Sequence, residues 1–141
     1  MKTKQILLGG LAGGVTFFFL GWLVYGVLLS GYMAANLNQC AAKPMNEMVW
    51  WAMILSNLTL GLLLSLVFSW SNTKGIRDGA KVAAIIGLLA AASFDLSSYS
   101  MNNLFNSITA LLVDVITYTI LVTVTGVVVA LVMGKKDELN S

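Results

Sequence analysis

Long runs of apolar residues dominate the chain, and short polar stretches separate them. Four of these runs are long enough to cross the hydrocarbon core of a bilayer, which is roughly 30 Å thick and takes about 20 helical residues. The pattern predicts membrane-spanning helices over residues 6–29, 48–70, 79–98 and 108–133. We therefore expect an all-α membrane protein in which residues 1–141 form a single four-transmembrane-helix bundle.

Composition supports this class of protein. Of the 141 residues, 58% are hydrophobic and only 10% are charged, whereas about a quarter of the residues of a soluble domain are charged. The basic residues are spread over loops and tails instead of forming one face, so we do not expect nucleic-acid binding. The chain has no histidine and one cysteine, Cys40, which excludes an intramolecular disulfide and argues against a metal or haem cofactor.

The basic residues also predict the orientation of the bundle. Seven of the eight flank the same side of the predicted spans, at Lys2, Lys4, Lys74, Arg77, Lys81, Lys135 and Lys136. The loop after the third span has none. Because lysine and arginine are retained in cytoplasmic loops, both termini are expected in the cytoplasm, an N-in/C-in topology.

Small residues indicate how the helices pack, since lipid gives no hydrophobic drive for helices to associate. The first span contains two overlapping Gly-x-x-x-Gly pairs, formed by Gly9, Gly10, Gly13 and Gly14. We expect them to pack within the chain, and dimerisation is the alternative. In the second span an inward-facing stripe is predicted over Asn57, Gly61, Ser65 and Ser69. The alanine-rich third span is expected to be surrounded by its neighbours, and Gly75 and Gly79 are expected to flank a tight connection before it.

Two acidic residues lie within the predicted spans, Asp95 late in the third and Asp114 early in the fourth. A carboxylate at the centre of a membrane helix costs about 2.5–3.5 kcal/mol, so such a residue faces the bundle interior and is a functional-site hypothesis. The third helix runs outward and the fourth returns, which places both carboxyl groups in the outer half of the membrane on neighbouring helices.

Other polar side chains are expected at the same depth. We predict a polar pocket that opens toward the extracytoplasmic side and is lined by Tyr25, Asn57, Asp95, Asp114 and Tyr118. Two close carboxyl groups in a low dielectric do not both ionise readily, so they are candidates for ligand binding or proton coupling. The alternative is that each aspartate forms hydrogen bonds with its neighbours and only fixes the packing of the helices.

The sequence does not favour an enzyme. An intramembrane aspartyl protease would use two aspartates but also a Gly-x-Gly-Asp signature, which is absent. A four-helix quinone or disulfide oxidoreductase would need a Cys-x-x-Cys pair. No catalytic residue is assigned.

The stretch Gly21-Trp22-Leu23-Val24-Tyr25-Gly26-Val27-Leu28-Leu29 resembles the first helix of a group of uncharacterised bacterial four-helix integral membrane proteins, a domain of unknown function, and the region 75–87 is similar too. This resemblance implies a compact four-helix fold in the bacterial cytoplasmic (inner) membrane and no known activity. Small multidrug transporters are also four-helix chains of this size. They typically carry a glutamate in the first helix, where this chain has no acid.

Three hypotheses for function remain. The leading one is binding of a small amphipathic or cationic molecule, or a lipid, near Asp95 and Asp114. The second is an accessory or assembly subunit in which Gly10 and Gly14 dock a partner membrane protein. The third is proton-coupled transport by a homodimer. The expected partners are therefore membrane lipids together with a small-molecule ligand, a second copy of the chain or a partner protein.

Overall fold

The computed structural model describes residues 2–38, 43 and 45–139, so Cys40 lies outside the described residues. The described chain is helical, with the elements α1 (Lys2–Leu23), η1 (Val24–Leu28), α2 (Ser30–Asn36), η3 (Met45–Glu47), α3 (Trp50–Trp70), α4 (Gly75–Met101) and α5 (Ile108–Leu139). Four helical stretches are long and apolar enough to cross a membrane, namely Thr3–Leu28, Trp50–Trp70, Gly75–Met101 and Ile108–Gly134. The prediction of four helices long and apolar enough to span a membrane is confirmed, and the third of these helices is longer than predicted at both ends.

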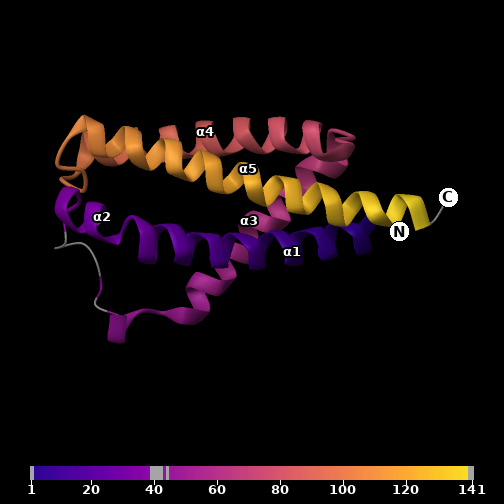
Figure 1. The fold of residues 1–141 in the computed structure, drawn as a ribbon, viewed down its shortest axis with the longest axis horizontal. Coiled ribbons are helices and arrows are strands. Elements are labelled where there is room, and N and C mark those ends of the chain that lie inside the picture. Colours follow the sequence, from indigo (N-terminus) through magenta and orange to yellow (C-terminus); the bar gives the residue numbers. More distant parts are fainter. Residues whose placement is uncertain (1, 39–42, 44, 140–141) are drawn as a thin grey trace.

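Three of the long helices run roughly alongside one another, and the fourth crosses them. In Figure 1, α1 and α5 lie side by side and α4 follows α5, while α3 passes obliquely across α1. The first turn of α1 and the last turn of α5 lie at the same end of the molecule, and the loop between α4 and α5 lies at the opposite end. We refer to that opposite end as the distal end.

Glycines allow α1 and α3 to touch backbone to backbone. A Cβ atom added to Gly10 would lie 3.0 Å from the Cα atom of Leu62, and one added to Gly14 would lie 2.7 Å from the Cα atom of Leu58. Gly61 of α3 packs directly on the backbone of α1 at Gly10 and Gly14. These glycines are buried within a single chain. In the structure α3 occupies this face, which agrees with the expected packing within the chain. Docking of a partner through Gly10 and Gly14 stays a prediction.

The central helix is α5 and not the alanine-rich α4. The α5 helix contacts α1, α3 and α4. Only one face of α4 is thin, because Gly79, Ala83, Gly87 and Ala91 recur every four residues and all are buried against α5. The opposite face carries large side chains, such as Leu89 with 63% of its surface exposed. The expectation that α4 is surrounded by its neighbours is wrong, since its small residues form a single stripe.

The connection between α3 and α4 consists of residues 71–74, before the expected position. The Thr73 backbone N–H donates to the Phe68 carbonyl at 2.9 Å, while Asn72 adopts a left-handed φ of 53°, a combination that ends α3. Gly75 then has a φ of 82°, which an L side chain rarely adopts. This glycine opens α4 a full turn before Gly79, so the prediction of a Gly75–Gly79 loop is wrong.

Glycine-to-alanine substitutions at two helical positions test the α1–α3 contact. We expect Gly61→Ala to lower the free energy of unfolding by about 1–3 kcal/mol, because the added methyl group has no space against α1. Gly21→Ala is the matched control, since nothing lies within 4 Å of its added Cβ atom and alanine is the better helix former. Thermal unfolding in mild detergent, followed by circular dichroism, measures both. Equal melting temperatures for the two variants would contradict this account of the packing.

Candidate functional site

The α4–α5 contact brings Asp95 and Asp114 together. Small residues on the two antiparallel helices meet at intervals of four residues, so that an added Cβ atom on Gly79 lies 2.7 Å from the Ala130 Cβ and one on Gly87 lies 2.9 Å from the Val122 Cβ. The residue numbers in each pair add up to the same value. Continuing this register by two steps from Gly87 and Val122 places Asp95 opposite Asp114, and the two carboxyl groups interact.

Both carboxyl groups lie well inside the spans. Asp95 lies six positions before the end of α4 at Met101, and Asp114 lies six positions after the start of α5 at Ile108. At 1.5 Å per residue, each Cα lies about 9 Å from the distal end of its helix. The expectation that the aspartates lie at one depth on neighbouring helices therefore agrees with the geometry of the structure.

Tyrosines from two helices complete the polar group. The hydroxyl of Tyr25 faces the Asp114 carboxyl and interacts with it. Tyr25 lies in η1, a π-helical turn closed by a 2.7 Å hydrogen bond from the Leu29 N–H to the Val24 carbonyl. Such turns occur frequently at functional sites. Tyr118 is one turn beyond Asp114 on α5, and its ring packs edge-on against Phe17 of α1 at a centroid distance of 5.6 Å.

Two irregular segments cover the group at the distal end. Leu37 and Phe105 form an isolated antiparallel bridge. It is flanked by hydrogen bonds from the Asn38 N–H to the Leu104 carbonyl at 2.8 Å and from the Asn106 N–H to the Asn36 carbonyl at 3.0 Å. We call these paired segments, residues 36–38 and 104–106, the distal cap. The cap lies over this end of the site, with Leu37 and Leu104 half-buried and Phe105 buried. The opening of the pocket toward the extracytoplasmic side stays a prediction.

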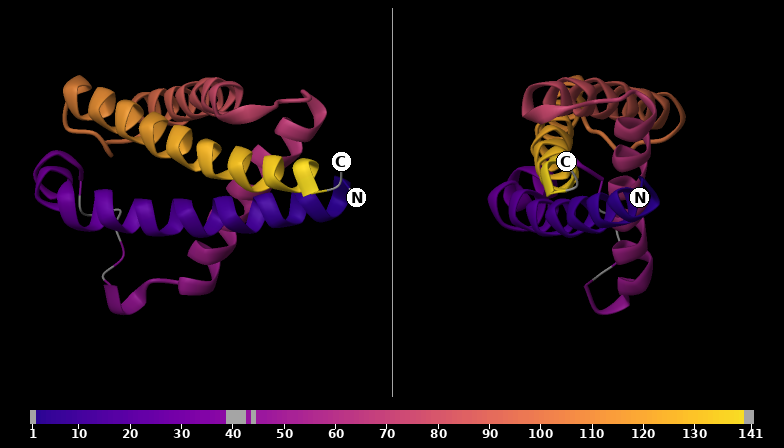
Figure 2. Two further views of the ribbon diagram at one scale, coloured as in Figure 1. Left: turned by 45° about the vertical axis from the view of Figure 1, so that its right-hand side comes forward. Right: turned by 90° about the vertical axis from the view of Figure 1, so that its right-hand side faces the viewer.

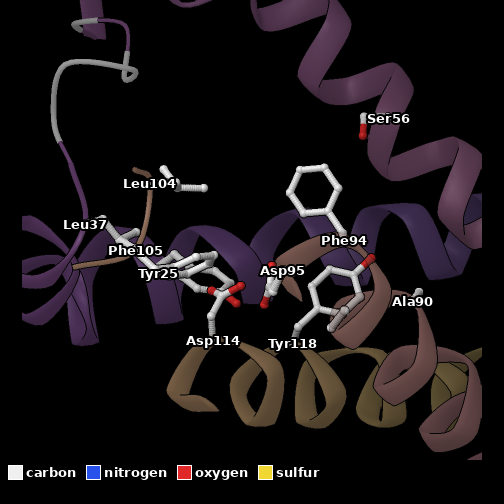
Figure 3. A pocket seen from close by; sticks show the side chains of 11 residues that line it. Tyr25, Leu37, Ser56, Ala90, Phe94, Asp95, Leu104, Phe105, Asp114 and Tyr118 are labelled. Atoms are coloured by element: carbon white, nitrogen blue, oxygen red, sulfur yellow. The ribbon is translucent and has the colours of Figure 1, made fainter. Parts of the chain in front are cut away.

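Beneath the cap lies a cavity of about 640 Å³, which we call the acidic pocket. It is lined by Tyr25, Leu37, Ser56, Ala90, Ala91, Phe94, Asp95, Leu104, Phe105, Asp114 and Tyr118. Figure 3 shows the Tyr25, Asp114 and Asp95 side chains in a row, with Phe94 and Tyr118 next to Asp95 and Ser56 across the pocket on α3. No lysine or arginine is among these residues.

The Asp95 side chain is buried with an unused acceptor. It is 3% exposed, and its Oδ2 atom has no hydrogen-bond partner. Most other polar groups within the spans are satisfied locally, as when the Thr117 and Thr125 hydroxyls donate to carbonyls four residues back at 2.7 and 2.8 Å. Within the described part of the chain, the only other buried side-chain atom lacking a partner is the Ser65 Oγ at the α1–α3 contact. Because Asp95 also lines the acidic pocket, its unpaired buried oxygen makes it a candidate for holding a ligand or a proton.

Of the five residues predicted to line the pocket, Asn57 lies elsewhere. Its side-chain amide donates to the Met53 carbonyl at 2.6 Å, and its backbone packs near Gly14 of α1. Asn57 shares its face of α3 with Gly61 and Ser65, which turn toward α1. It therefore faces α1 and not the aspartates, although its depth is as predicted. Its neighbour Ser56, about 100° further round the helix, lines the pocket in its place.

Several pocket residues gave no signal in the sequence. Phe94 and Ala90 read as ordinary apolar residues of a span, and Leu37, Leu104 and Phe105 belong to connections whose pairing depends on the fold. The site also brings together few metal ligands. Within the residues that the structure describes, no three His, Cys, Asp or Glu side chains gather as they would around a metal ion.

Comparisons with known proteins found no relative of this chain. No family model matches the chain, and no match is found among curated proteins or among solved structures. The chemistry of the acidic pocket is therefore the basis on which function is inferred.

Asp95→Asn tests whether the buried carboxyl group is retained at the expense of stability. The amide is isosteric and uncharged and can donate to Asp114, so we expect the free energy of unfolding to rise by about 1 kcal/mol or more. Asp78→Asn is the control, because Asp78 is exposed in the first turn of α4, where a negative charge is slightly stabilising. A lower melting temperature for Asp95→Asn would instead identify Asp95 as a structural residue.

Proposed function

We propose that this multi-pass membrane protein binds a small amphipathic cation in the acidic pocket, between Asp95 and Asp114. The observation that supports the proposal best is the buried Asp95 carboxyl group, which belongs to a residue lining the pocket, has one oxygen without a hydrogen-bond partner and has a second carboxyl group opposite. Tyr25 and Tyr118 are the other polar groups of the site.

Charge balance favours a cation over other ligands. Two carboxyl groups in a region of low dielectric constant need a counter-ion or a proton, because desolvating an unpaired charge is costly. No basic side chain lines the pocket, so the chain itself supplies no counter-ion. An anionic ligand would be repelled, and a purely apolar ligand would leave the carboxyl groups unpaired. A bound cation compensates the charge directly.

A proton is the competing occupant, and this favours proton-coupled transport as a second candidate function. Asp95 and Asp114 are the acidic groups that face the site, while Tyr25 and Tyr118 are its other titratable groups, and neither the cap nor α3 adds one. A protein that exchanges one proton for one cation at such a pair can couple the two. The homodimeric transporter remains a proposal on this ground, and reconstituted vesicles that show no cation flux under a pH gradient would exclude it.

The proposed orientation places the pocket in the extracytoplasmic half of a bacterial inner membrane. Lys4, Lys74, Arg77 and Lys81 belong to the start of α1 and the α3–α4 region, which lie at the end of the molecule opposite the distal cap. The positive-inside rule assigns this end to the cytoplasm. The cap and the first turns of α5 then face outward.

Single cysteines introduced into a Cys40→Ser background test this topology. We expect Asn103→Cys, in the exposed α4–α5 loop, to react with a membrane-impermeant maleimide added to intact cells. Asn72→Cys, in the exposed α3–α4 turn, should react only after the cells are permeabilised. The reverse pattern would place the acidic pocket in the cytoplasmic half and contradict the proposed orientation.

Binding of benzyltrimethylammonium to the chain in lipid nanodiscs tests the proposed function. We expect saturable binding that falls at least about tenfold in Asp95→Asn and in Asp114→Asn, because each variant removes one of two anionic partners of a desolvated cation. Asp78→Asn removes the same charge outside the pocket and should bind as the unmodified chain does. The neutral isostere neopentylbenzene should show no dependence on either aspartate.

The same measurement should depend on pH. Protonation of either carboxyl group removes the charge that holds the cation, so binding is expected to weaken as pH falls and to strengthen as it rises. Asp114→Asn should flatten this dependence, since it leaves one titrating carboxyl group. Binding that is independent of pH and of both aspartates would contradict the proposal.

A further inference from the structure

The acidic pocket opens at its side, between α3 and α4. Its only exposed lining residues are Ser56, Ala90 and Phe94, which all belong to these two helices, whereas in the distal cap Leu37 and Leu104 are half-buried and Phe105 is only 7% exposed. The two helices barely contact each other, because α3 crosses the molecule obliquely. We call the gap bounded by Ser56, Ala90 and Phe94 the side opening, and Figure 3 shows Phe94 and Ser56 on its two sides.

The side opening lies at the depth of lipid chains. Ser56 is six residues from the start of α3, and Phe94 is seven residues from the end of α4. At 1.5 Å per residue, Phe94 is about 10 Å from the distal end of α4, and Ser56 is about 9 Å along the oblique α3. A molecule using this route therefore comes from the hydrocarbon of the leaflet that the distal end faces, where amphiphiles concentrate, and not directly from water.

Four aromatic rings surround the acidic pair, from Tyr25, Phe94, Phe105 and Tyr118. Ring faces attract cations, and Tyr and Phe rings around an anionic group suit an alkylated ammonium, which has methyl groups to bury and few or no N–H donors to satisfy. The remaining lining is apolar, at Leu37, Ala90, Ala91 and Leu104.

These features extend the proposed function, on which this inference rests. We propose that the ligand is an amphiphile with an alkylated ammonium head group and a hydrocarbon chain, and that it binds through the side opening. The head group lies against Asp95 and Asp114 among the aromatic rings. The hydrocarbon chain passes between Ser56 and Phe94 and remains in the lipid.

Filling the side opening tests this arrangement. Two probes, decyltrimethylammonium and tetramethylammonium, are titrated against the chain in nanodiscs at equilibrium. We expect Ser56→Phe and Ala90→Phe to weaken the binding of decyltrimethylammonium at least about tenfold, because the new ring occupies the path of its hydrocarbon chain. The affinity for tetramethylammonium should change less than about threefold. Thr59→Phe and Ser93→Phe are matched controls, since both positions are exposed on the same helices but do not line the pocket. Their affinities for both probes should stay unchanged, which also corrects for partitioning of the longer probe into lipid.

The outcomes separate this inference from the function it extends. If Asp114→Asn abolishes binding of both probes but Ser56→Phe and Ala90→Phe leave decyltrimethylammonium unaffected, the side opening is not the path and the inference is overturned while cation binding stands. If neither probe binds in a manner that depends on Asp114, the proposed function itself fails.

The head-group class has its own test in Phe94→Leu, which keeps an apolar side chain but removes the ring. We expect decyltrimethylammonium to lose about three- to tenfold in affinity while decylammonium loses less than twofold. An equal loss for the two probes would overturn the preference for alkylated ammonium.

Discussion

The close packing of α4 on α5 determines the rest of the candidate site. Gly79 and Ala83 meet Ala130 and Gly126 so closely that no larger side chain fits, and this fixes both the distance between the helices and their register. Because the contacts between α4 and α5 recur every four residues on both helices, a register fixed at one end also holds at the other. There it sets Asp95 against Asp114. A slip by one residue would rotate one carboxyl group by about 100° and separate the pair. The small residues at the end of the α4–α5 pair away from the distal cap therefore position the polar groups of the distal half.

Polar side chains within the spans form their hydrogen bonds in two different ways. Hydroxyl and amide side chains such as Thr119 and Asn57 donate to carbonyls of the preceding turn at 2.7 and 2.6 Å, which satisfies them without a partner helix. A carboxylate has no donor and cannot use this solution, so Asp95 and Asp114 must find a partner outside their own helix. They find one another and Tyr25, and one oxygen of Asp95 is still unpaired. This is the local conflict that is expected at functional sites and uncommon in purely structural contacts.

The sequence allowed the spans and the depth of the aspartates to be predicted, because both depend on one-dimensional properties, apolar length and distance from a helix end. Rotation about the helix axis was harder to predict. Asn57 has the expected depth but turns toward the glycines of α1, since the contact at Gly61 fixes the rotation of α3. The π-helical turn at Val24–Leu28 and the bridge between Leu37 and Phe105 leave no periodic trace, so neither Tyr25's exact setting nor the distal cap follows from hydropathy. The α4 helix was wrongly expected to be surrounded by its neighbours, because its alanines were counted without regard to the larger side chains between them.

The glycine contact of α1 with α3 connects stability to access. Helices that meet backbone to backbone through small residues cross at an angle set by their ridges instead of running parallel. From the contact at Gly61, the two helices therefore diverge toward the distal end, and the first turns of α3 stand away from α4. That divergence leaves Ser56 and Phe94 on either side of an opening into the acidic pocket. A more parallel α3 would bury more surface against α4 and α5 but would close the proposed side opening, so the same few glycines hold the bundle together and keep α3 away from α4 beside the acidic pocket.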